Sequence, residues 1–228
     1  RTYMQKTYFA SDEKIDLSID IAERELEILK KIDYENGYSL YIGIPFCPTT
    51  CLYCSFTSYP LVSWRQKVDS YLDALEKELD YVAVKFGKKH LNSIYIGGGT
   101  PTTLEPYQLD RLIRKIRCSF DLSHCLEFTV EAGRPDSITR EKLETLKKWD
   151  ITRISINPQT MKDETLKIIG RRHTVAQTVE SFQLARELGF DDINMDLIMG
   201  LPQESLEDVR DTLVQVKALK PDNLTVHS

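Results

Sequence analysis

Long hydrophobic runs are missing from this 228-residue sequence, because a charge, a glycine or a proline interrupts every extended apolar stretch. The sequence therefore predicts no membrane-spanning helix, which needs about 20 apolar residues in a row. A basic segment followed by an apolar one is also missing at the start, so we expect no secretory signal. Positive charge is not in excess either, since 30 Lys and Arg stand against 35 Asp and Glu. That balance predicts neither a nucleic-acid nor an anionic-membrane partner.

Cysteine is scarce and occurs in an odd number, five, in a chain too large to need covalent staples. A disulfide scaffold is therefore not expected, and a reducing, cytoplasmic location fits better. The remaining composition is that of a globular protein, with 41% hydrophobic and 29% charged residues. These proportions exclude disordered and fibrous classes.

Short apolar strands alternate with amphipathic helices along the whole chain. The helix expected over residues 15–30 carries Ile19, Ala22, Leu26 and Leu29 on one face, and we expect the long helices to pack on the core. The pattern predicts six strands, over residues 40–44, 93–96, 127–131, 153–156, 193–198 and 224–226. Such alternation indicates an α/β fold with parallel strands and right-handed crossovers. Periodicity allows a doubly wound sheet or an incomplete barrel, and both place chemistry at the carboxyl ends of the strands.

Three cysteines lie within eight residues after the first strand, as Cys47-x3-Cys51-x2-Cys54. Three thiolates in one loop can hold a [4Fe–4S] cluster and leave its fourth iron open to a small chelating molecule. A structural zinc site would need a fourth ligand, and none of the four histidines is near in sequence. Reduced thiols without a metal are the remaining alternative. Cys118 and Cys125 are expected to be structural.

Polar residues stand at the ends of the later strands. Glu131 closes a strand and can bond an amine or ribose hydroxyls at the mouth of the sheet, although a solvated charge is the alternative. Asp196 interrupts an apolar strand, where a carboxylate is costly unless it is paired or serves a site. Three glycines, Gly97 to Gly99, follow the second strand and can let backbone approach a ligand closely, although a tight turn between strand and helix is the alternative.

The cysteine spacing and its neighbours resemble the radical S-adenosylmethionine (SAM) superfamily. The segments Tyr41–Cys47, Gly97–Thr102 and Asn194–Pro202 resemble the anaerobic coproporphyrinogen III oxidase branch. Within it, Glu131–Asp136 and Ser155–Thr160 are most similar to coproporphyrinogen dehydrogenases of the HemZ type. The resemblance implies a partial (β/α)6 barrel. We expect an N-terminal helical extension over residues 1–36 and the radical SAM core over residues 37–228, without the substrate-covering C-terminal domain of the family.

The resemblance also implies which residues bind the cofactors. The [4Fe–4S] cluster is expected on the three loop cysteines, and no protein acid or base is expected to catalyse hydrogen abstraction. SAM is expected to contact Tyr41, Tyr53, Gly98, Gly99, Thr100, Glu131, Gln159, Arg171 and Asp196. An arginine suits the SAM carboxylate because its donors form a fork, although solvation of Arg171 at the surface is the alternative.

The implied activity is reductive cleavage of SAM followed by oxidative decarboxylation of coproporphyrinogen III to protoporphyrinogen IX. The implied partners are this tetrapyrrole and an electron donor such as flavodoxin or ferredoxin. Other anaerobic oxidases of the branch have a further cysteine two residues after the third ligand, where this sequence has Phe56, as in HemZ-type and haem-chaperone-like members. A haem-binding chaperone on the same scaffold is therefore one alternative function, and a structural zinc module is another.

Overall fold

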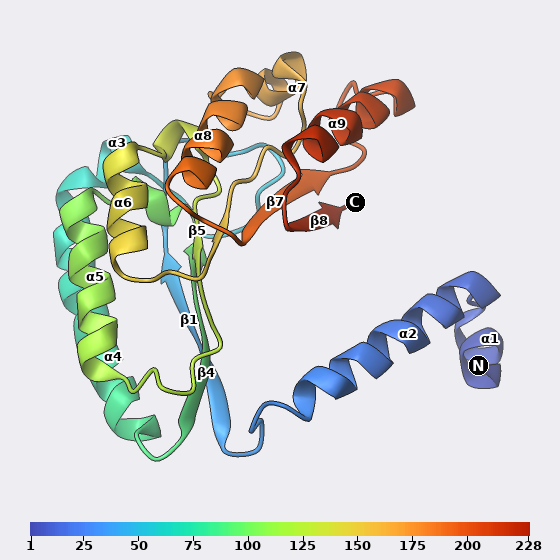
Figure 1. The fold of residues 1–228 in the computed structure, drawn as a ribbon. Coiled ribbons are helices and arrows are strands. Elements are labelled where there is room, and N and C mark those ends of the chain that lie inside the picture. Colours follow the sequence, from blue (N-terminus) through green and yellow to red (C-terminus); the bar gives the residue numbers. More distant parts are fainter.

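The computed structural model describes all 228 residues, and its centre is a sheet of six parallel strands. The sheet order is β1-β4-β5-β6-β7-β8, so neighbours in space follow one another along the chain. A doubly wound sheet would reverse direction at a switch point, and this sheet does not. The strands wind in one direction into a partial (β/α)6 barrel, which confirms the architecture implied by the resemblance (Figure 1). The strands are β1 (Gly37–Ile44), β4 (His90–Gly98), β5 (Glu127–Glu131), β6 (Arg153–Ser155), β7 (Ile193–Ile198) and β8 (Asn223–His227).

Helices cover the outer face of the sheet, and α4, α5 and α6 lie side by side outside β1, β4 and β5 (Figure 1). Side-chain caps start several of these helices: Thr139, Thr174 and Ser205 each accept a backbone N–H in the first turn. The outer helices are α3 (Leu61–Trp64), α4 (Val68–Phe86), α5 (Pro106–Ser119), α6 (Arg140–Lys148), α7 (Asp163–Ile168), α8 (Val175–Glu187) and α9 (Leu206–Leu219). No helix combines the length and hydropathy that a bilayer crossing requires.

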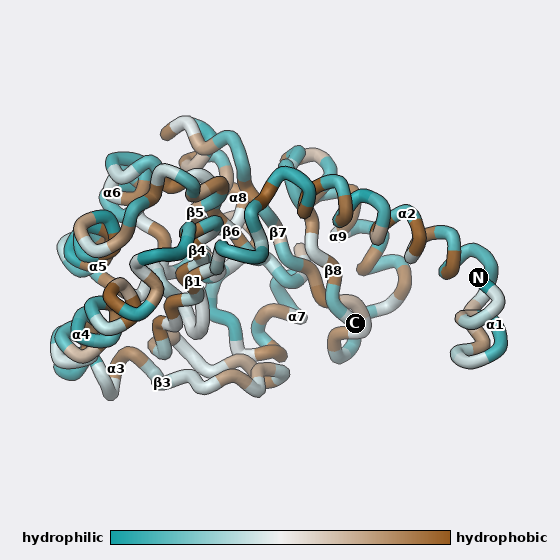
Figure 2. The backbone as a smooth tube through the Cα atoms, turned by 90° about the horizontal axis from the view of Figure 1, so that it is seen from below, coloured by the Kyte–Doolittle hydropathy of each residue, from teal (hydrophilic) through white to brown (hydrophobic).

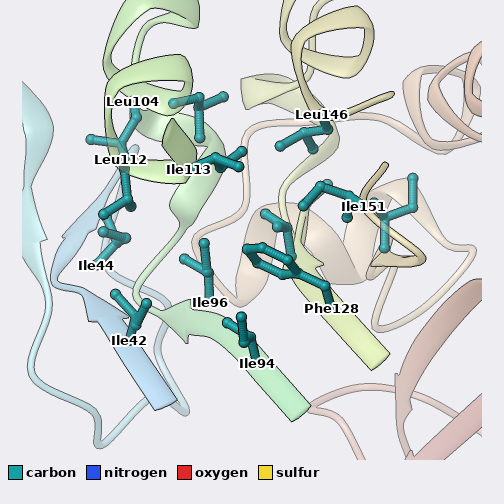
Figure 3. Packing of buried hydrophobic residues seen from close by; sticks show 14 of the residues in the cluster. Ile42, Ile44, Ile94, Ile96, Leu104, Leu112, Ile113, Phe128, Leu146 and Ile151 are labelled. Carbon is teal, nitrogen blue, oxygen red and sulfur yellow. The ribbon is translucent and has the colours of Figure 1, made fainter. Parts of the chain in front are cut away.

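The main core lies between the sheet and these helices. Alternate residues of a strand face opposite sides, and Ile42 and Ile96 point toward Leu112 and Ile113 of α5 (Figure 3). All four side chains are at most 2% exposed, and each contributes about 1.5–3 kcal/mol of burial free energy. The residues that alternate with Ile42 along β1 and with Ile96 along β4 therefore face the inside of the barrel.

The cysteine segment contains two short strands. These are β2 (Phe46–Cys47) and β3 (Tyr59–Pro60), which pair with each other in parallel. Tyr59 N–H also donates to the Pro45 carbonyl at 2.7 Å. The two ends of the cysteine segment are thus held together beside the end of β1.

The N-terminal helices α1 (Thr2–Tyr8) and α2 (Asp12–Leu29) project away from the barrel (Figure 1). The expected helix over residues 15–30 is therefore present, but its expected packing on the core is wrong. Ile15 is the one buried residue of α2, and Leu26 is 57% exposed. Figure 2 shows apolar and polar segments alternating along α2 at the margin of the molecule. The apolar face of α2 stays exposed because the helix projects away from the barrel and covers neither side of the sheet.

Candidate cluster and nucleotide site

The cysteine loop lies across the carboxyl ends of the strands and is fixed to the barrel by hydrogen bonds. Thr100 N–H donates to the Phe46 carbonyl at 2.8 Å, and Leu52 N–H donates to the Ile169 carbonyl at 2.9 Å. The Thr49 hydroxyl donates to the Gly170 carbonyl at 2.9 Å. The loop is therefore anchored at the end of β1 and again beyond α7, across the mouth of the barrel.

The three loop cysteines are free thiols at different depths. Cys47 is buried, whereas Cys51 and Cys54 are partly exposed. The Thr100 hydroxyl donates to Cys47 Sγ at 3.5 Å, and burial raises the pKa of this thiol. No group of three His, Cys, Asp or Glu side chains is drawn together around a single ion position. A four-iron cluster binds each thiolate at a different iron. Three cysteine thiols in one loop are the donor set of a cluster with one open iron.

The glycine turn after β4 lies directly against the cysteine loop. A Cβ on Gly99 would stand 2.7 Å from the Phe46 carbonyl oxygen and 2.9 Å from Cys47 Sγ. Gly98 has a φ of 103°, which disfavours any side chain. Glycine is therefore required here so that the turn can pass beside the buried cysteine.

Glu131 lies inside the barrel with two tyrosines. Tyr95 O–H donates to the Glu131 carboxylate, and the Tyr95 ring stacks on Tyr41 with centroids 5.9 Å apart. Burial raises the pKa of Glu131 to about 7; the Tyr95 hydrogen bond opposes this, and the charge of Asp196 adds to it. The solvated-charge alternative for Glu131 is therefore wrong. This carboxyl changes protonation near neutral pH.

Asp196 and Gln159 meet at β7, two strands along the sheet from Glu131. Asn194 Nδ2 donates to the Asp196 carboxylate at 2.6 Å, so the acid in this strand is paired. Gln159 N–H donates to the Asp196 carbonyl at 3.0 Å, and the Gln159 carbonyl accepts from Ile198 N–H at 3.0 Å. The backbone of Gln159 has a φ of 68°, a conformation that costs a non-glycine residue about 1 kcal/mol or more. Such strain is typical of residues held for a site.

Arg171 is buried, at 7% exposure, so the surface alternative for this residue is wrong. Its Nη1 donates to the carbonyls of Asn157 at 2.6 Å and Gly133 at 3.1 Å, and its Nε donates to Tyr53 O–H at 3.2 Å. Burial raises the pKa of Tyr53 to about 12, which keeps its hydroxyl neutral. The remaining Nη2 donates to no protein acceptor, so the outer end of the fork can bind an anion.

Several polar residues of the site carried no role in the sequence analysis. Tyr95 looked like one more aromatic in a strand, and Asn194 looked like one more polar residue. The signal that could have found Tyr95 is alternation: it lies two residues before Gly97, on the face opposite Ile94 and Ile96. Arg134 belongs to a segment used for the resemblance, yet its burial at 3% exposure could not be read from the sequence.

His173 is a buried histidine beside the site, and neither ring nitrogen has a hydrogen-bond partner. Its pKa is lowered to about 4, mainly by burial. The positive charge of Arg171 also lowers the pKa, and this effect is larger than the increase caused by Asp136. In the unfolded chain this histidine binds a proton near pH 6.5, whereas in the folded protein it stays neutral until about pH 4. The free energy of unfolding is therefore unaffected by His173 above pH 6.5 and decreases as the pH falls from 6.5 toward 4. We expect that loss to be about 3 kcal/mol.

His173→Phe replaces the imidazole by a ring that cannot be protonated. This variant should no longer show the loss of stability that His173 causes at acid pH. Urea denaturation at pH 7 and pH 4.5 measures the change in the free energy of unfolding for the variant and for the unmodified protein. The two changes are compared because Glu131, whose pKa is raised, stabilises the folded state as the pH falls over the same range. The exposed His124, changed in the same way, should keep the original profile. Equal acid sensitivity of the His173 variant would contradict the assignment.

The radical SAM superfamily profile matches residues 41–216. The oxygen-independent coproporphyrinogen-III oxidase-like protein HemZ of Bacillus subtilis is 45% identical over 99% of this chain and 46% of its own length. Heme chaperone HemW of the same organism is 42% identical over 83% of this chain and 50% of its own length. The structure of the Escherichia coli coproporphyrinogen III oxidase HemN superposes with a TM-score of 0.77, at 34% identity, over 83% of this chain and 43% of that one.

The chain thus spans about half the length of the relatives it matches. The matched residues include the cysteine loop, the glycine turn and the ends of β5 and β7. Members of this superfamily use a [4Fe–4S] cluster and SAM, and the site has thiols, a close glycine turn and partly buried carboxyls that suit both. The chain belongs to the radical SAM superfamily.

Proposed function

We propose that Cys47, Cys51 and Cys54 hold the [4Fe–4S] cluster and that the protein uses it to cleave SAM reductively. The observation that carries the proposal is the anchored loop of three thiols, with the Gly99 turn pressed against Cys47 Sγ. The remaining iron of a three-thiolate cluster is open to the amino and carboxylate groups of SAM. When bound, the cluster and SAM together supply a 5′-deoxyadenosyl radical.

The residues of the barrel are proposed to bind and orient SAM. Gly98, Gly99 and Thr100 present backbone beside the cluster, where a ligand amine can approach closely. Arg171 would offer its free Nη2 to the SAM carboxylate, and Tyr53, held by Arg171, would flank the adenine. The Glu131 and Asp196 carboxylates, with the Gln159 amide, accept from the amine and ribose hydroxyls. Tyr41, stacked on Tyr95, would lie near the sulfonium.

The substrate we propose is coproporphyrinogen III. The 5′-deoxyadenosyl radical would take a hydrogen atom from the β-carbon of a propionate and become 5′-deoxyadenosine. Loss of CO2 and of one electron to an acceptor would then leave a vinyl group. Two such rounds give protoporphyrinogen IX, with electrons for SAM cleavage supplied by a donor such as flavodoxin or ferredoxin. A cavity of about 440 Å³ beside Gly98, lined by aromatic residues including Tyr41, Phe56, Tyr59 and Tyr71, supports a substrate built of pyrrole rings.

The test is anaerobic reconstitution of the full-length protein with iron and sulfide, followed by SAM and a strong reductant. The proposal expects 5′-deoxyadenosine and methionine in equal amounts. With coproporphyrinogen III added, the expected products are CO2 and protoporphyrinogen IX. A fully loaded protein that forms no 5′-deoxyadenosine with or without the tetrapyrrole would refute the enzymatic proposal.

A haem-binding chaperone is the second candidate, favoured by the 42% identity to heme chaperone HemW and by Phe56. The two candidates differ in which tetrapyrrole they engage and in whether it changes. Haem titration of the loaded protein, followed by absorbance, should show tight stoichiometric binding for a chaperone. Turnover of coproporphyrinogen without stoichiometric haem binding supports the oxidase.

The affinity for SAM should depend on the ionisation of Glu131. Its pKa is about 7 because the carboxyl is buried, so it is mostly protonated at pH 6 and mostly ionised at pH 8. A SAM molecule that donates to this carboxylate should therefore bind about tenfold more weakly at pH 6 than at pH 8. Glu131→Gln should weaken binding at pH 8 and remove most of the pH dependence. Anaerobic equilibrium dialysis of the loaded protein measures both.

The matched control is Glu127→Gln, because Glu127 starts the same strand and is engaged by Thr129 and Arg153 away from the strand's carboxyl end. This variant should keep the affinity and the pH profile of the unmodified protein, including any titration of SAM itself. If Glu131→Gln retains the full pH dependence, Glu131 is not the group that controls SAM binding.

A further inference from the structure

A buried arginine outside the proposed SAM contacts reaches the cysteine loop. Arg134 follows β5 and has a side chain that is 3% exposed. Its Nη1 lies 3.6 Å from Cys51 Sγ and 3.3 Å from the Thr49 carbonyl oxygen, and its Nη2 donates to the Thr49 hydroxyl at 3.0 Å. One guanidinium thus contacts both a backbone carbonyl of the loop and one of its sulfurs.

The opposite edge of the same guanidinium pairs with Asp136. Arg134 Nε lies 3.1 Å from one carboxylate oxygen and Nη2 lies 3.0 Å from the other, the two-point geometry of a strong charge-assisted pair. His173 Nδ1 lies 3.9 Å from the Asp136 carboxylate, and its lowered pKa keeps it neutral at pH 7. Asp136 is therefore the one carboxylate that compensates Arg134 by direct contact, and it also fixes the orientation of the fork.

Taking a guanidinium out of water is costly, and the Asp136 pair satisfies only one of its edges. The other edge is satisfied by Thr49 and by the sulfur of Cys51. A thiolate bound to iron is a better acceptor for this edge than a neutral thiol, because it carries negative charge. Reduction of a cluster adds one more negative charge, and a nearby N–H donor stabilises the reduced form more than the oxidised form.

We propose that Arg134 is a positioning residue that fixes the Cys51 segment and, through its N–H group at Sγ, raises the reduction potential of the cluster. The inference rests on the proposed role of the three cysteines as cluster ligands. It assigns opposite effects to two neighbouring residues. Arg134 brings a positive charge to the sulfur, and Asp136 offsets that charge from behind.

The test is potentiometric titration of the reconstituted full-length protein without SAM, with the reduced cluster followed by electron paramagnetic resonance. At the midpoint potential of the unmodified protein, Arg134→Gln should lower the ratio of reduced to oxidised cluster about tenfold, or about 59 mV for one electron. Asp136→Asn should move the midpoint in the opposite direction, because it leaves the guanidinium charge less compensated. Arg172→Gln, an exposed arginine beside the same loop, should leave it unchanged.

Midpoint potentials that shift in opposite directions in the two variants distinguish this role from simple loss of structure. Loss of structure would shift the midpoint potential in the same direction in both. If Arg134→Gln fails to load iron, Arg134→Lys replaces it and should also titrate at a lower potential, since lysine cannot hold Asp136 and Cys51 together. A loaded Arg134 variant at the original midpoint, or an Asp136→Asn midpoint that does not rise, overturns the proposal. Failure of the unmodified protein to form a cluster would instead refute the proposed ligands.

Discussion

Cys47→Ala is expected to lower the iron and sulfide bound per chain at least about tenfold, with a matching loss of SAM cleavage. Each iron of a four-iron cluster needs one ligand, and the remaining two thiols would leave two corners open. Cys47 is also the buried member of the three, so water cannot replace its sulfur without entering the packed turn beside Gly99. Iron and acid-labile sulfide analysis after anaerobic reconstitution measures the loss directly.

The other two cysteines of the chain provide matched controls. Cys118 is exposed on α5, and Cys125 donates to the carbonyl of Glu127 at the start of β5, away from the loop. Alanine at either position should leave iron, sulfide and 5′-deoxyadenosine formation unchanged. Full cluster content in the Cys47 variant, or its loss in the Cys118 variant, would remove the basis for the proposed ligand set.

The sheet was accessible from the sequence because each strand is a short apolar run between breakers. The expected strand over residues 127–131 coincides with β5, and that over 193–198 coincides with β7. Periodicity could not choose between a doubly wound sheet and a barrel, since both repeat a strand and a helix. The choice depends on the order of strands in space, which the resemblance supplied and the sheet order confirmed.

The position of the helix over residues 15–30 could not be predicted from the sequence. Its apolar spacing is that of a core helix, but α2 leaves the barrel and Leu26 remains exposed. Amphipathic spacing says that a helix has an apolar face, and it does not say what covers that face. The position of the helix depends on the direction the chain takes between residues 30 and 37, which no local pattern records.

Some residues of the candidate site could likewise be predicted from the sequence, and others could not. The cysteines, Glu131 and Asp196 stood out because their chemistry is unusual where they occur in the sequence. Tyr95 and Arg134 did not, because a tyrosine in a strand and an arginine in a turn are ordinary. Their significance comes from burial and from partners distant in sequence: Tyr95 bonds Glu131, and Arg134 reaches Cys51 across 83 positions.

Gly99→Ala should disable the site although it adds only one methyl group. That methyl would meet the Phe46 carbonyl oxygen at 2.7 Å, Cys47 Sγ at 2.9 Å and the Ile44 carbonyl oxygen at 3.0 Å. Two of these atoms belong to the backbone and the third ends a short, buried side chain, so the cysteine loop or the turn must shift. Overpacking of this kind costs about 1–3 kcal/mol of stability. A displacement of about 1 Å at a reacting centre can cost about 100-fold in rate, so we expect a loss of that order in 5′-deoxyadenosine formation.

Gly43→Ala is the matched control, because the nearest atom its methyl would meet is Tyr41 Cε1 at 3.7 Å, an ordinary contact. This variant should keep the thermal stability and the cluster content of the unmodified protein. The comparison separates the loss of a glycine from the loss of space beside Cys47, since both glycines lie at the carboxyl ends of the first two barrel strands. Normal loading and normal SAM cleavage in the Gly99 variant would mean that the loop moves freely there, and the close approach of turn and sulfur would then have no part in the chemistry.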